Sequence, residues 1–355
     1  MILDSGDCNM HPESSILKSK QMTNPTFMKH ISILVPKGAV ALGCIEGPFI
    51  LFNKVNEFLE SIGKSALFRV QLVGLTKEPQ VYDKFFSVSP DCAIKDIRKT
   101  DLIIVPAVNG EMKKVIAMNE GFFPWIIKQH DNGAEVASLC VGAFLLAATG
   151  LMKGKQCSTH WGSCDEFRKM FPDVDLVSDR IITDEQGLYS SGGANSFWNL
   201  LLYLLEKYTD RQMAILFSKY YAIEIDRGTQ SPFTIFRGQK DHEDESIKKA
   251  QEFIEKNFQE KITVDQLASM LAIGRRNLER RFKKATSNSV IEYMQRVKIE
   301  AAKKNLESSR ENVNEVMYKV GYTDTKAFRT TFKKFTGLSP VQYRTKYNRE
   351  AMVLS

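Results

Sequence analysis

The chain has 355 residues, of which 43% are hydrophobic and 26% are charged. This composition is typical of folded globular proteins and excludes a largely disordered chain, a collagen-like repeat and a disulfide-dense miniprotein. The longest apolar stretch without charge, residues 136–152, is shorter than the ~20 residues that a membrane-spanning helix needs. The first residues, MILDSGDCNMHPESS, do not resemble a secretory signal. We therefore expect a cytoplasmic protein with no membrane partner, whose six cysteines are reduced thiols.

The net charge of +7 is unevenly distributed along the chain. Residues 245–355 contain 23 Lys and Arg against 13 Asp and Glu, which gives +10, whereas the first 244 residues carry −3. A basic segment of this size attached to a slightly acidic one favours a polyanionic partner, most often nucleic acid. The alternative is a solvated basic surface without a partner.

The first part of the chain predicts a tail followed by an α/β domain. Residues 1–29 are polar and have no apolar period, so we expect a mobile tail. From His30 onward, short apolar runs alternate with helix-length segments such as 47–62 and 113–131. Because these runs are continuously apolar, they predict strands buried on both faces of a doubly wound parallel sheet. The runs are ISILV (31–35), VQLVGL (70–75), DLIIVPA (101–107) and EVASLC (135–140).

A hairpin and a long helix complete this domain before the pattern changes. RIITDEQGLYSS (180–191) predicts the hairpin, and FWNLLLYLLEKY (197–208) predicts the apolar helix. The apolar periodicity then stops, because glycine, proline and the acidic stretch DHEDE interrupt it. We expect an α/β domain over 30–225, a linker over 226–244, an all-helical domain over 245–345 and a tail over 346–355.

The helical region contains an internal repeat. RRFKKAT (280–286) recurs 50 residues later as TTFKKFT (330–336). Two pairs of residues are spaced to form capping boxes at helix starts, Thr263 with Gln266 and Asn312 with Glu315. Each copy is predicted to form a helix, a short turn and a second helix, so the region is expected to be a double helix-turn-helix.

The outward faces of the two second helices are rich in residues that can contact DNA. Arg, Lys and Thr on a helix that fits the major groove can bind base edges or phosphates. The alternative is that these side chains are merely solvated. The faces carry Arg275, Arg276, Glu279 and Arg280 in the first copy, and Thr325, Lys326, Arg329 and Thr330 in the second.

Residues 247–345 resemble the DNA-binding domain of AraC/XylS-type transcription regulators. The most specific part is GYTDTKAFRTTFKKFTGLSPVQYR (321–344), which resembles the second recognition helix and C-terminal signature of that family. Gly274, Ser287 and Val290 stand where a capping Ser, a Gly and a Pro are usual in that family. These departures do not change the outward faces of the two second helices. The resemblance implies sequence-specific binding of double-stranded DNA by Arg276, Glu279, Arg280, Thr325, Lys326, Arg329 and Thr330.

The segment EVASLCVGAFLLAATGLMKGKQCSTHW (135–161) predicts a sharp turn from a strand into a helix. The buried strand ends at Cys140, Gly142 permits the turn, and an apolar helix follows. A cysteine at the positive end of a helix can have a lowered pKa and be reactive. The alternative is a buried, inert cysteine.

Residues 30–212 resemble the ThiJ/PfpI superfamily, which has a flavodoxin-like, class I glutamine-amidotransferase-like fold. The same segment carries this resemblance, together with SSGGANSFWNLLLYLLEKY and RGTQSPFTIF (227–236), which fit the subgroup fused ahead of an AraC-type domain. The resemblance implies that Cys140 is the cysteine of the turn and that His160 is the histidine near it. It also implies a homodimer.

Three departures from that family argue against catalysis. The position from which active members place an acid beside the cysteine is Cys44, and Glu46 is two residues out of register. In that family, glycines after the third strand line the pocket with their backbone amides, and here Ala107-Val108-Asn109 stands in their place. Val141 follows the cysteine where the peptidase-like members carry His. A nucleophile without these partners is weakly equipped for acyl chemistry. We predict a non-catalytic domain that senses a ligand or redox state; the alternative is a cysteine hydrolase, hydratase or glyoxalase fused to a DNA-binding domain.

The remaining expectations concern cofactors, partners and single residues. The five histidines lack a two-ligand spacing and no glycine-rich phosphate motif occurs, so we expect no metal and no cofactor. The predicted partners are double-stranded DNA, RNA polymerase, a small-molecule effector and a second copy of the chain. A non-specific architectural DNA binder is a third possibility. Cys44 and Cys140 are expected to lie close together, and Trp161 and Trp198 to lie in the core.

Overall fold

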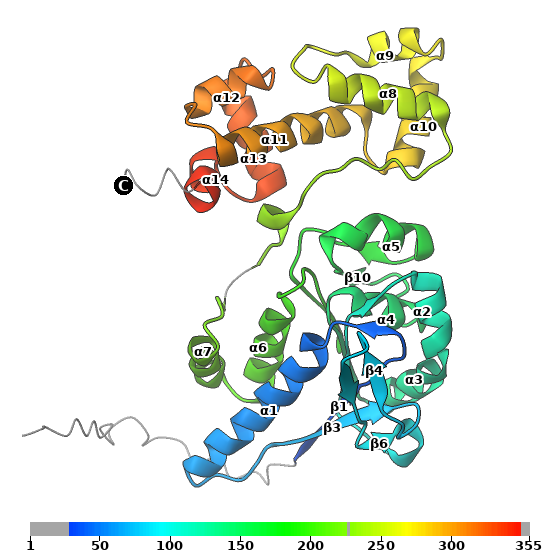
Figure 1. Cartoon of the computed structure of the whole chain (residues 1–355), viewed down its shortest axis with the longest axis vertical. Helices are drawn as coiled ribbons and strands as arrows, with labels where there is room; N and C mark the ends of the chain where they lie inside the picture. The colour runs from blue at the N-terminus through cyan, green and yellow to red at the C-terminus, as the bar shows by residue number, and fades with distance from the viewer. Residues whose placement is uncertain (1–27, 226–227, 349–355) are drawn as a thin grey trace, which may run out of the picture.

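A computed structural model describes residues 28–225 and 228–348 of the chain. Figure 1 shows an N-terminal lobe, residues 28–225, and a C-terminal lobe, residues 245–348, joined by a connector, residues 228–244. The predicted tails lie largely outside the described residues. The first strand nevertheless begins at Lys29, and the last helix continues to Tyr347.

The N-terminal lobe is built around a seven-stranded sheet with the order β12-β13-β9-β7-β1-β3-β6. Its neighbouring strands pair in parallel, except that β12 and β13 form the predicted antiparallel hairpin. Because β1, β7 and β9 lie in the middle of the sheet, most of their residues are buried. The predicted α/β fold with a parallel sheet is therefore confirmed. The strands are β1 (Lys29–Leu34), β3 (Phe68–Gly74), β6 (Cys92–Ala93), β7 (Leu102–Val105), β9 (Glu135–Ser138), β12 (Ile182–Glu185) and β13 (Leu188–Ser191).

Three short ladders lie outside this sheet. Strand β2, which precedes the first helix in the chain, forms an antiparallel ladder with β8, and the antiparallel pair β4 and β5 forms a hairpin. The third ladder, β10 with β11, is parallel. Their bounds are β2 (Ala39–Val40), β4 (Gln80–Tyr82), β5 (Phe86–Val88), β8 (Val108–Asn109), β10 (Gln156–Cys157) and β11 (Asp175–Leu176).

Helices cover both faces of the sheet (Figure 1). Helices α1 and α6 pack on one face, with α7 against α6, and α2, α3 and α4 pack on the other. Of the helices in the described part of the chain, none combines the length and the apolar character needed to cross a bilayer. The helices of this lobe are α1 (Gly43–Ser61), α2 (Met112–Asn119), α3 (Phe123–Asp131), α4 (Ala143–Ala148), α5 (Cys164–Met170), α6 (Phe197–Tyr208) and α7 (Arg211–Tyr220).

The C-terminal lobe consists of two helical units that share one long helix, α11. The first core buries Val290 and Tyr293 of α11 together with residues of α8, α9 and α10. The second core buries Ile299, Ala302 and Leu306 of α11 together with residues of α12, α13 and α14. The predicted double helix-turn-helix is confirmed, with α9–α10 and α12–α13 as its two copies. The helices are α8 (Glu245–Lys256), α9 (Val264–Met270), α10 (Arg275–Thr286), α11 (Val290–Ser308), α12 (Val313–Lys319), α13 (Thr325–Thr336) and α14 (Pro340–Tyr347).

Local side-chain chemistry defines where these helices begin. Two capping boxes form as predicted, Thr263 with Gln266 at α9 and Asn312 with Glu315 at α12. Asp324 caps α13 through its carboxylate, whereas Gly274 offers α10 no side-chain cap. The first recognition helix is therefore held less firmly at its start than the second.

Each helix-turn-helix also needs residues in the left-handed conformation. Ala272 (φ 50°) ends α9, and the equivalent residue after α12 is Gly321 (φ 75°). In both turns the amide of the next residue closes a Schellman motif. The same contrast recurs after the second helices, where Ser287 (φ 58°) corresponds to Gly337 (φ 71°). The first copy thus holds two non-glycine residues in a conformation that costs roughly 1–2 kcal/mol each.

The connector is hydrogen-bonded to the N-terminal lobe by its first residues. The side chain of Gln230 is fully buried, and its Nε2 donates to the carbonyl oxygens of Thr159 at 3.0 Å and Ser178 at 2.9 Å. Thr229 Oγ1 donates to the carbonyl oxygen of Asp179 at 2.9 Å. Because these acceptors are backbone groups, the contact depends on the path of the chain rather than on a particular partner side chain.

Its later residues are held by the C-terminal lobe. Lys303, which is buried, donates to the carbonyl oxygen of Thr234 at 2.6 Å and to Glu300 Oε2 at 2.7 Å. Glu300 Oε2 in turn accepts from the amide of Phe236 at 3.1 Å. The Phe236 ring meets Tyr293 edge-on with 5.1 Å between centroids. The connector is therefore packed against both lobes.

We predict that a fragment of residues 230–355 unfolds at a higher temperature than a fragment of residues 245–355. Only the longer fragment keeps Thr234 and Phe236, which satisfy the buried Lys303–Glu300 pair, and leaving such groups unsatisfied costs about 1–3 kcal/mol. Circular dichroism melts of both fragments measure the difference. Equal melting temperatures would show that the connector adds nothing to the stability of the C-terminal lobe.

We also predict that Ser287→Gly raises the free energy of unfolding of the C-terminal lobe by about 0.5–1 kcal/mol, because glycine adopts φ near 58° without a Cβ clash. The reciprocal change Gly337→Ser should lower it by a similar amount. A Cβ at Gly337 would come no closer than 3.5 Å to Thr229, so its cost comes from the backbone. Urea denaturation of the three proteins tests this, and identical midpoints would contradict it.

Candidate functional site

The exposed faces of α10 and α13 form the candidate nucleic-acid interface. Leu278 and Phe282 of α10, and Phe328 and Phe332 of α13, are fully buried and turn the opposite faces to solvent. The seven residues predicted to bind DNA all lie on these solvent faces. They are Arg276, Glu279 and Arg280 on α10 and Thr325, Lys326, Arg329 and Thr330 on α13.

The charges on α10 are held in place by weak surface pairs. Arg275 lies 3.2 Å from Glu279 and 3.1 Å from Asp265. Arg280 makes one hydrogen bond within its own helix, and Arg276 forms no ion pair with the described residues. Exposed pairs of this kind contribute about 0–1 kcal/mol, so a phosphate or a base edge can replace them.

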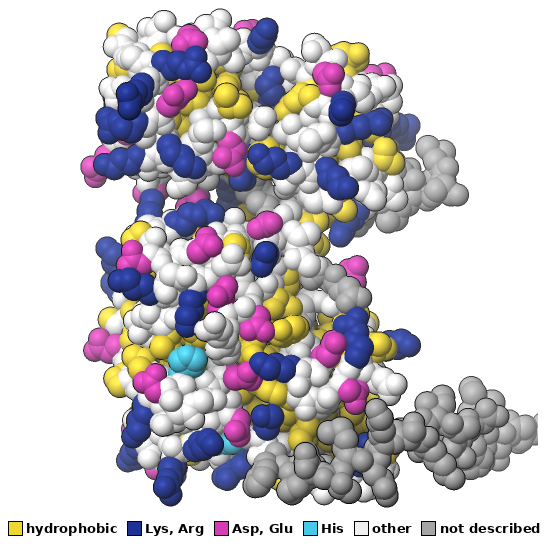
Figure 2. Space-filling view, turned by 180° about the vertical axis from the view of Figure 1, so that it is seen from behind, with side chains coloured by type: hydrophobic (Ala, Val, Ile, Leu, Met, Phe, Trp, Pro, Cys, Tyr) yellow, Lys and Arg dark blue, Asp and Glu magenta, His cyan; other side chains and the backbone are white. Residues whose placement is uncertain are grey.

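The equivalent face of α13 is more open. Lys326 and Arg329 form no ion pair within the described part of the chain. Figure 2 shows Lys and Arg side chains spread over the C-terminal lobe. This surface provides the positive potential that attracts a polyanion.

The second candidate site is the turn that follows β9. Cys140 adopts φ 54° and begins a 3₁₀ turn, Cys140–Gly142, that leads into α4. Gly142 is required because a Cβ there would lie 2.5 Å from the carbonyl oxygen of Val105. Since β9 lies between β7 and β13, the turn is at the carboxyl edge of the sheet, where α/β proteins bind ligands. The predicted strand-to-helix turn at Cys140 is confirmed.

Of the two alternatives for the Cys140 thiol, the structure favours the buried, inert one. Burial raises the pKa of Cys140 to about 12, the neighbouring Cys44 adds to the rise, and the Val141 amide offsets part of it. Burial, which disfavours the charged thiolate, therefore affects this pKa more than the dipole of the short helix α4 does. At neutral pH Cys140 is an uncharged thiol and a poor nucleophile.

His160 is engaged with its own turn rather than with this thiol in the described structure. Its Nδ1 accepts a hydrogen bond from the amide of Gly162 at 3.1 Å, and its ring lies against Trp161 with 5.1 Å between centroids. Burial lowers the pKa of His160, so the ring is neutral at pH 7. Within the described residues His160 forms no hydrogen bond to Cys140. Its role in this structure is to cap the 3₁₀ turn that precedes α5.

Cys44 and Glu46 complete the set of residues predicted around the turn. Cys44 is buried; burial raises the pKa of its thiol to about 11, and the Ala107 amide offsets part of the rise. Its electrostatic effect on Cys140 shows that the two are neighbours, as expected. Glu46 is exposed and forms no ion pair with the described residues. The turn therefore brings together two neutral thiols without an acid.

Sequence reasoning missed two hydroxyl groups that hold the turn. The Cys140 amide donates to Ser191 Oγ at 3.1 Å, and Thr159 Oγ1 donates to the Cys140 carbonyl at 3.1 Å. Ser191 reaches this position because β13 pairs with β9. That pairing has no local signal. Thr159, by contrast, directly precedes His160, which was already a candidate residue, so its place near the turn could have been predicted from the sequence.

The two tryptophans expected in the core are only partly buried. Trp161 lies at the wall of a cavity between the lobes. Trp198 packs against Tyr221 with 4.9 Å between ring centroids, at the edge of another cavity. An apolar sequence context did not distinguish a core position from a partly exposed one. In the described residues, no group of three His, Cys, Asp or Glu side chains is arranged to hold a metal ion.

Comparison with known proteins gives separate matches for the two lobes. A model described as a helix-turn-helix domain matches residues 267–346, and the DJ-1/PfpI family model matches residues 50–207. The HTH-type transcriptional regulator GbdR from Pseudomonas aeruginosa is 25% identical over 264 residues, which cover 71% of this chain and 68% of GbdR. CdhR, an HTH-type transcriptional regulator from the same organism, is 22% identical over 289 residues, covering 78% of this chain and 82% of CdhR.

A solved structure supports the architecture of the N-terminal lobe. It is a protein from Vibrio parahaemolyticus whose proposed role is transcriptional regulation. It aligns with a TM-score of 0.50 at 20% identity and covers 54% of this chain and 98% of its own. At this identity the likeness concerns the fold alone.

We predict that Cys140 resists alkylation by iodoacetamide in the folded protein at pH 8. A thiol with a pKa of about 12 is ionised there in roughly one molecule in 10,000. Because its pKa is raised, the rate should grow about tenfold per pH unit above pH 8 while the fold persists. Mass spectrometry of tryptic peptides measures the modification, and the urea-unfolded chain is the control. Rapid labelling of folded Cys140 at pH 8 would contradict the neutral thiol.

Proposed function

We propose that this chain, which combines an AraC-type helix-turn-helix domain with an N-terminal DJ-1/PfpI domain, uses its two recognition helices to read a specific DNA sequence under the control of a non-catalytic sensing lobe. AraC-type helix-turn-helix regulators bind DNA. The observation that carries the proposal is the pair of solvent faces on α10 and α13, which present Arg, Lys, Glu and Thr at equivalent places in two copies of one motif.

The residue types on these faces suit direct readout in the major groove. Arg276, Arg280 and Arg329 can each donate two hydrogen bonds to a guanine, and Glu279 can accept one from a cytosine. Thr325 and Thr330 can contact a thymine methyl group or a base edge, and Lys326 can contact a guanine or a phosphate. We propose these seven residues as the DNA-binding set.

The shared helix α11 connects the two copies and supports a proposal about how they are placed on DNA. It has 19 residues and is roughly 28 Å long. Successive major grooves on one face of B-DNA lie ~34 Å apart. We propose that α10 and α13 enter successive grooves on the same face of the duplex.

The N-terminal lobe is proposed to sense rather than to catalyse. Cys140 is a neutral, buried thiol, His160 is bound to the amide of Gly162, and Glu46 is exposed. Acyl or carbonyl chemistry needs an activated nucleophile with a base or acid in contact, and this turn lacks both among the described residues. The raised pKa values of Cys44 and Cys140 disfavour redox sensing, so a small-molecule effector is the favoured input. RNA polymerase and a second copy of the chain complete the proposed partners, and a DNA target implies a cytoplasmic location.

We predict that Arg280→Ala and Arg329→Ala each weaken binding to the preferred DNA sequence by roughly 1–3 kcal/mol, with a relaxed preference at one base position per variant. The preferred sequence is selected from random duplexes, and affinities for it and for random DNA are compared at one salt concentration. Lys128→Ala, an exposed charge on α3 of the N-terminal lobe, is the control and should change neither value.

Two other results would change this assignment. If both arginine variants weaken binding to every sequence equally, Arg280 and Arg329 bind phosphates rather than bases. If the wild-type chain shows no preference over random DNA, the sequence-specific function fails and the architectural alternative stands.

A further inference from the structure

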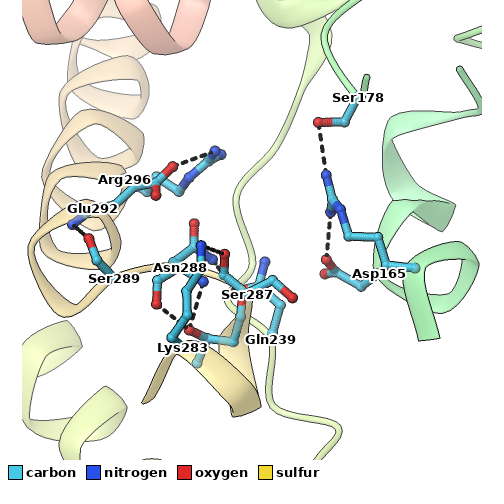
Figure 3. Close-up of polar contacts among 11 residues, drawn as sticks. Asp165, Ser178, Gln239, Lys283, Ser287, Asn288, Ser289, Glu292 and Arg296 are labelled. Atoms are coloured by element: carbon cyan, nitrogen blue, oxygen red, sulfur yellow. Dashed lines mark hydrogen bonds and ion pairs between the residues drawn. The ribbon is translucent and has the colours of Figure 1, made fainter. Parts of the chain in front are cut away.

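A cavity of about 600 Å³ lies where the N-terminal lobe, the connector and the C-terminal lobe meet. This volume is in the range of ~300–1,000 Å³ that is typical of sites for small molecules. Its walls come from α5, from the connector, from the junction of α10 with α11 and from the end of α13. Figure 3 shows Asp165 and Ser178 on one side of the connector, and Asn288 and Arg296 on the other. The cavity is distinct from the turn at Cys140.

Cationic side chains outnumber acidic ones along these walls. The cations are Arg168, Arg237, Lys283, Arg296 and Lys334, and the carboxylates are Asp165, Asp179 and Glu292. Asp165 is already paired with Arg168 at 3.3 Å, and Glu292 with Arg296 at 3.2 Å. The other three cations have no carboxylate partner among the described residues. Unpaired positive charge that is gathered in a cleft attracts anions.

Arg296 is fixed in a position from which it can bind an anion. Its guanidinium lies 4.8 Å from the ring centroid of Phe335 and 5.7 Å from that of Phe236. Its Nη2 donates to Glu292 Oε1, whereas its Nε is buried without an acceptor among the described residues. The aromatic rings restrict the side chain, so less conformational entropy is lost when its planar fork binds a carboxylate or a phosphate.

We propose that this cavity binds a small organic polyanion, a metabolite that carries two or more carboxylate or phosphate groups. Arg296 and Lys334 bind one anionic group from the C-terminal lobe, and Arg168 binds the other from the N-terminal lobe. The rings of Trp161 and Phe335, which also line the cavity, contact the carbon skeleton between them.

Binding in this cavity affects the DNA-binding helices directly. Lys283 and Lys334 stand in the last turns of α10 and α13, the two candidate recognition helices. A polyanion neutralises these charges and links the ends of both helices to α5. The ligand therefore lowers the affinity for DNA, and this coupling rests on the proposed function, whereas the binding site itself does not.

The test uses the full chain with two probes, citrate and inorganic pyrophosphate, at constant ionic strength. Isothermal titration calorimetry measures binding without DNA, and the fluorescence of Trp161, assigned with Trp161→Phe, reports occupancy of the cavity. We expect a dissociation constant below about 1 mM for at least one probe. Arg296→Gln and Lys334→Gln should each weaken it about tenfold or more. Lys304→Gln, an exposed charge on α11 outside the cavity, is the matched control and should not change it.

The outcomes separate the parts of the proposal. Tighter binding of citrate identifies a polycarboxylate ligand, and tighter binding of pyrophosphate identifies a phosphorylated one. Lack of binding by both probes up to about 10 mM, or equal binding by Arg296→Gln, Lys334→Gln and the wild type, overturns the site. Lys334→Gln keeps the test valid if Arg296→Gln does not fold, because Lys334 is exposed and forms no ion pair with the described residues. If the probe binds but DNA affinity is unchanged, the coupling is wrong; if DNA is not bound at all, the proposed function is wrong and the site stands.

Discussion

Two buried polar side chains, Gln230 and Lys303, determine how the two lobes are joined. A buried amide or ammonium group must be hydrogen-bonded, because leaving it unpaired away from water costs several kcal/mol in the worst cases. Gln230 finds its acceptors on backbone carbonyls of the N-terminal lobe, and Lys303 finds one of its acceptors on the connector itself. These hydrogen bonds favour the path that the connector takes between the lobes. The same connector forms part of the wall of the cavity between the lobes.

The backbone geometry of the turn at Cys140 does not depend on a charged sulfur. The close approach of Gly142 to β7, the left-handed Cys140 and the bonds to Ser191 and Thr159 all serve the path of the backbone. None of them requires a charged sulfur. Cys44, whose own pKa is raised by burial, is a neutral neighbour of this thiol. The thiol is then one more buried apolar group in the core of the lobe.

The features that the sequence predicted are those determined by residues close together in the chain. The capping boxes depend on side chains three residues apart, and the repeat depends on apolar spacing within single helices. The pKa of Cys140 instead depends on burial by strands and helices distant in sequence, so the local pattern could not decide between a reactive and an inert thiol. The connector has no apolar period, yet Gln230 is fully buried because its bonds are to distant carbonyls. Arg296 and its two aromatic partners, Phe236 and Phe335, lie in three separate segments of the chain. No rule of local sequence spacing could have predicted their contact.

The C-terminal lobe also limits how a signal can act on DNA binding. Both of its cores are built on α11, with Tyr293 in one and Leu306 in the other, so a single continuous helix sets the distance between the two recognition helices. Altering that distance would require bending α11, which has no internal proline or glycine at which a kink is easily made. A ligand between the lobes therefore acts on the charge around the recognition helices and on the position of the whole C-terminal lobe. Because the same packed helix belongs to both cores, it resists changes in the distance between α10 and α13.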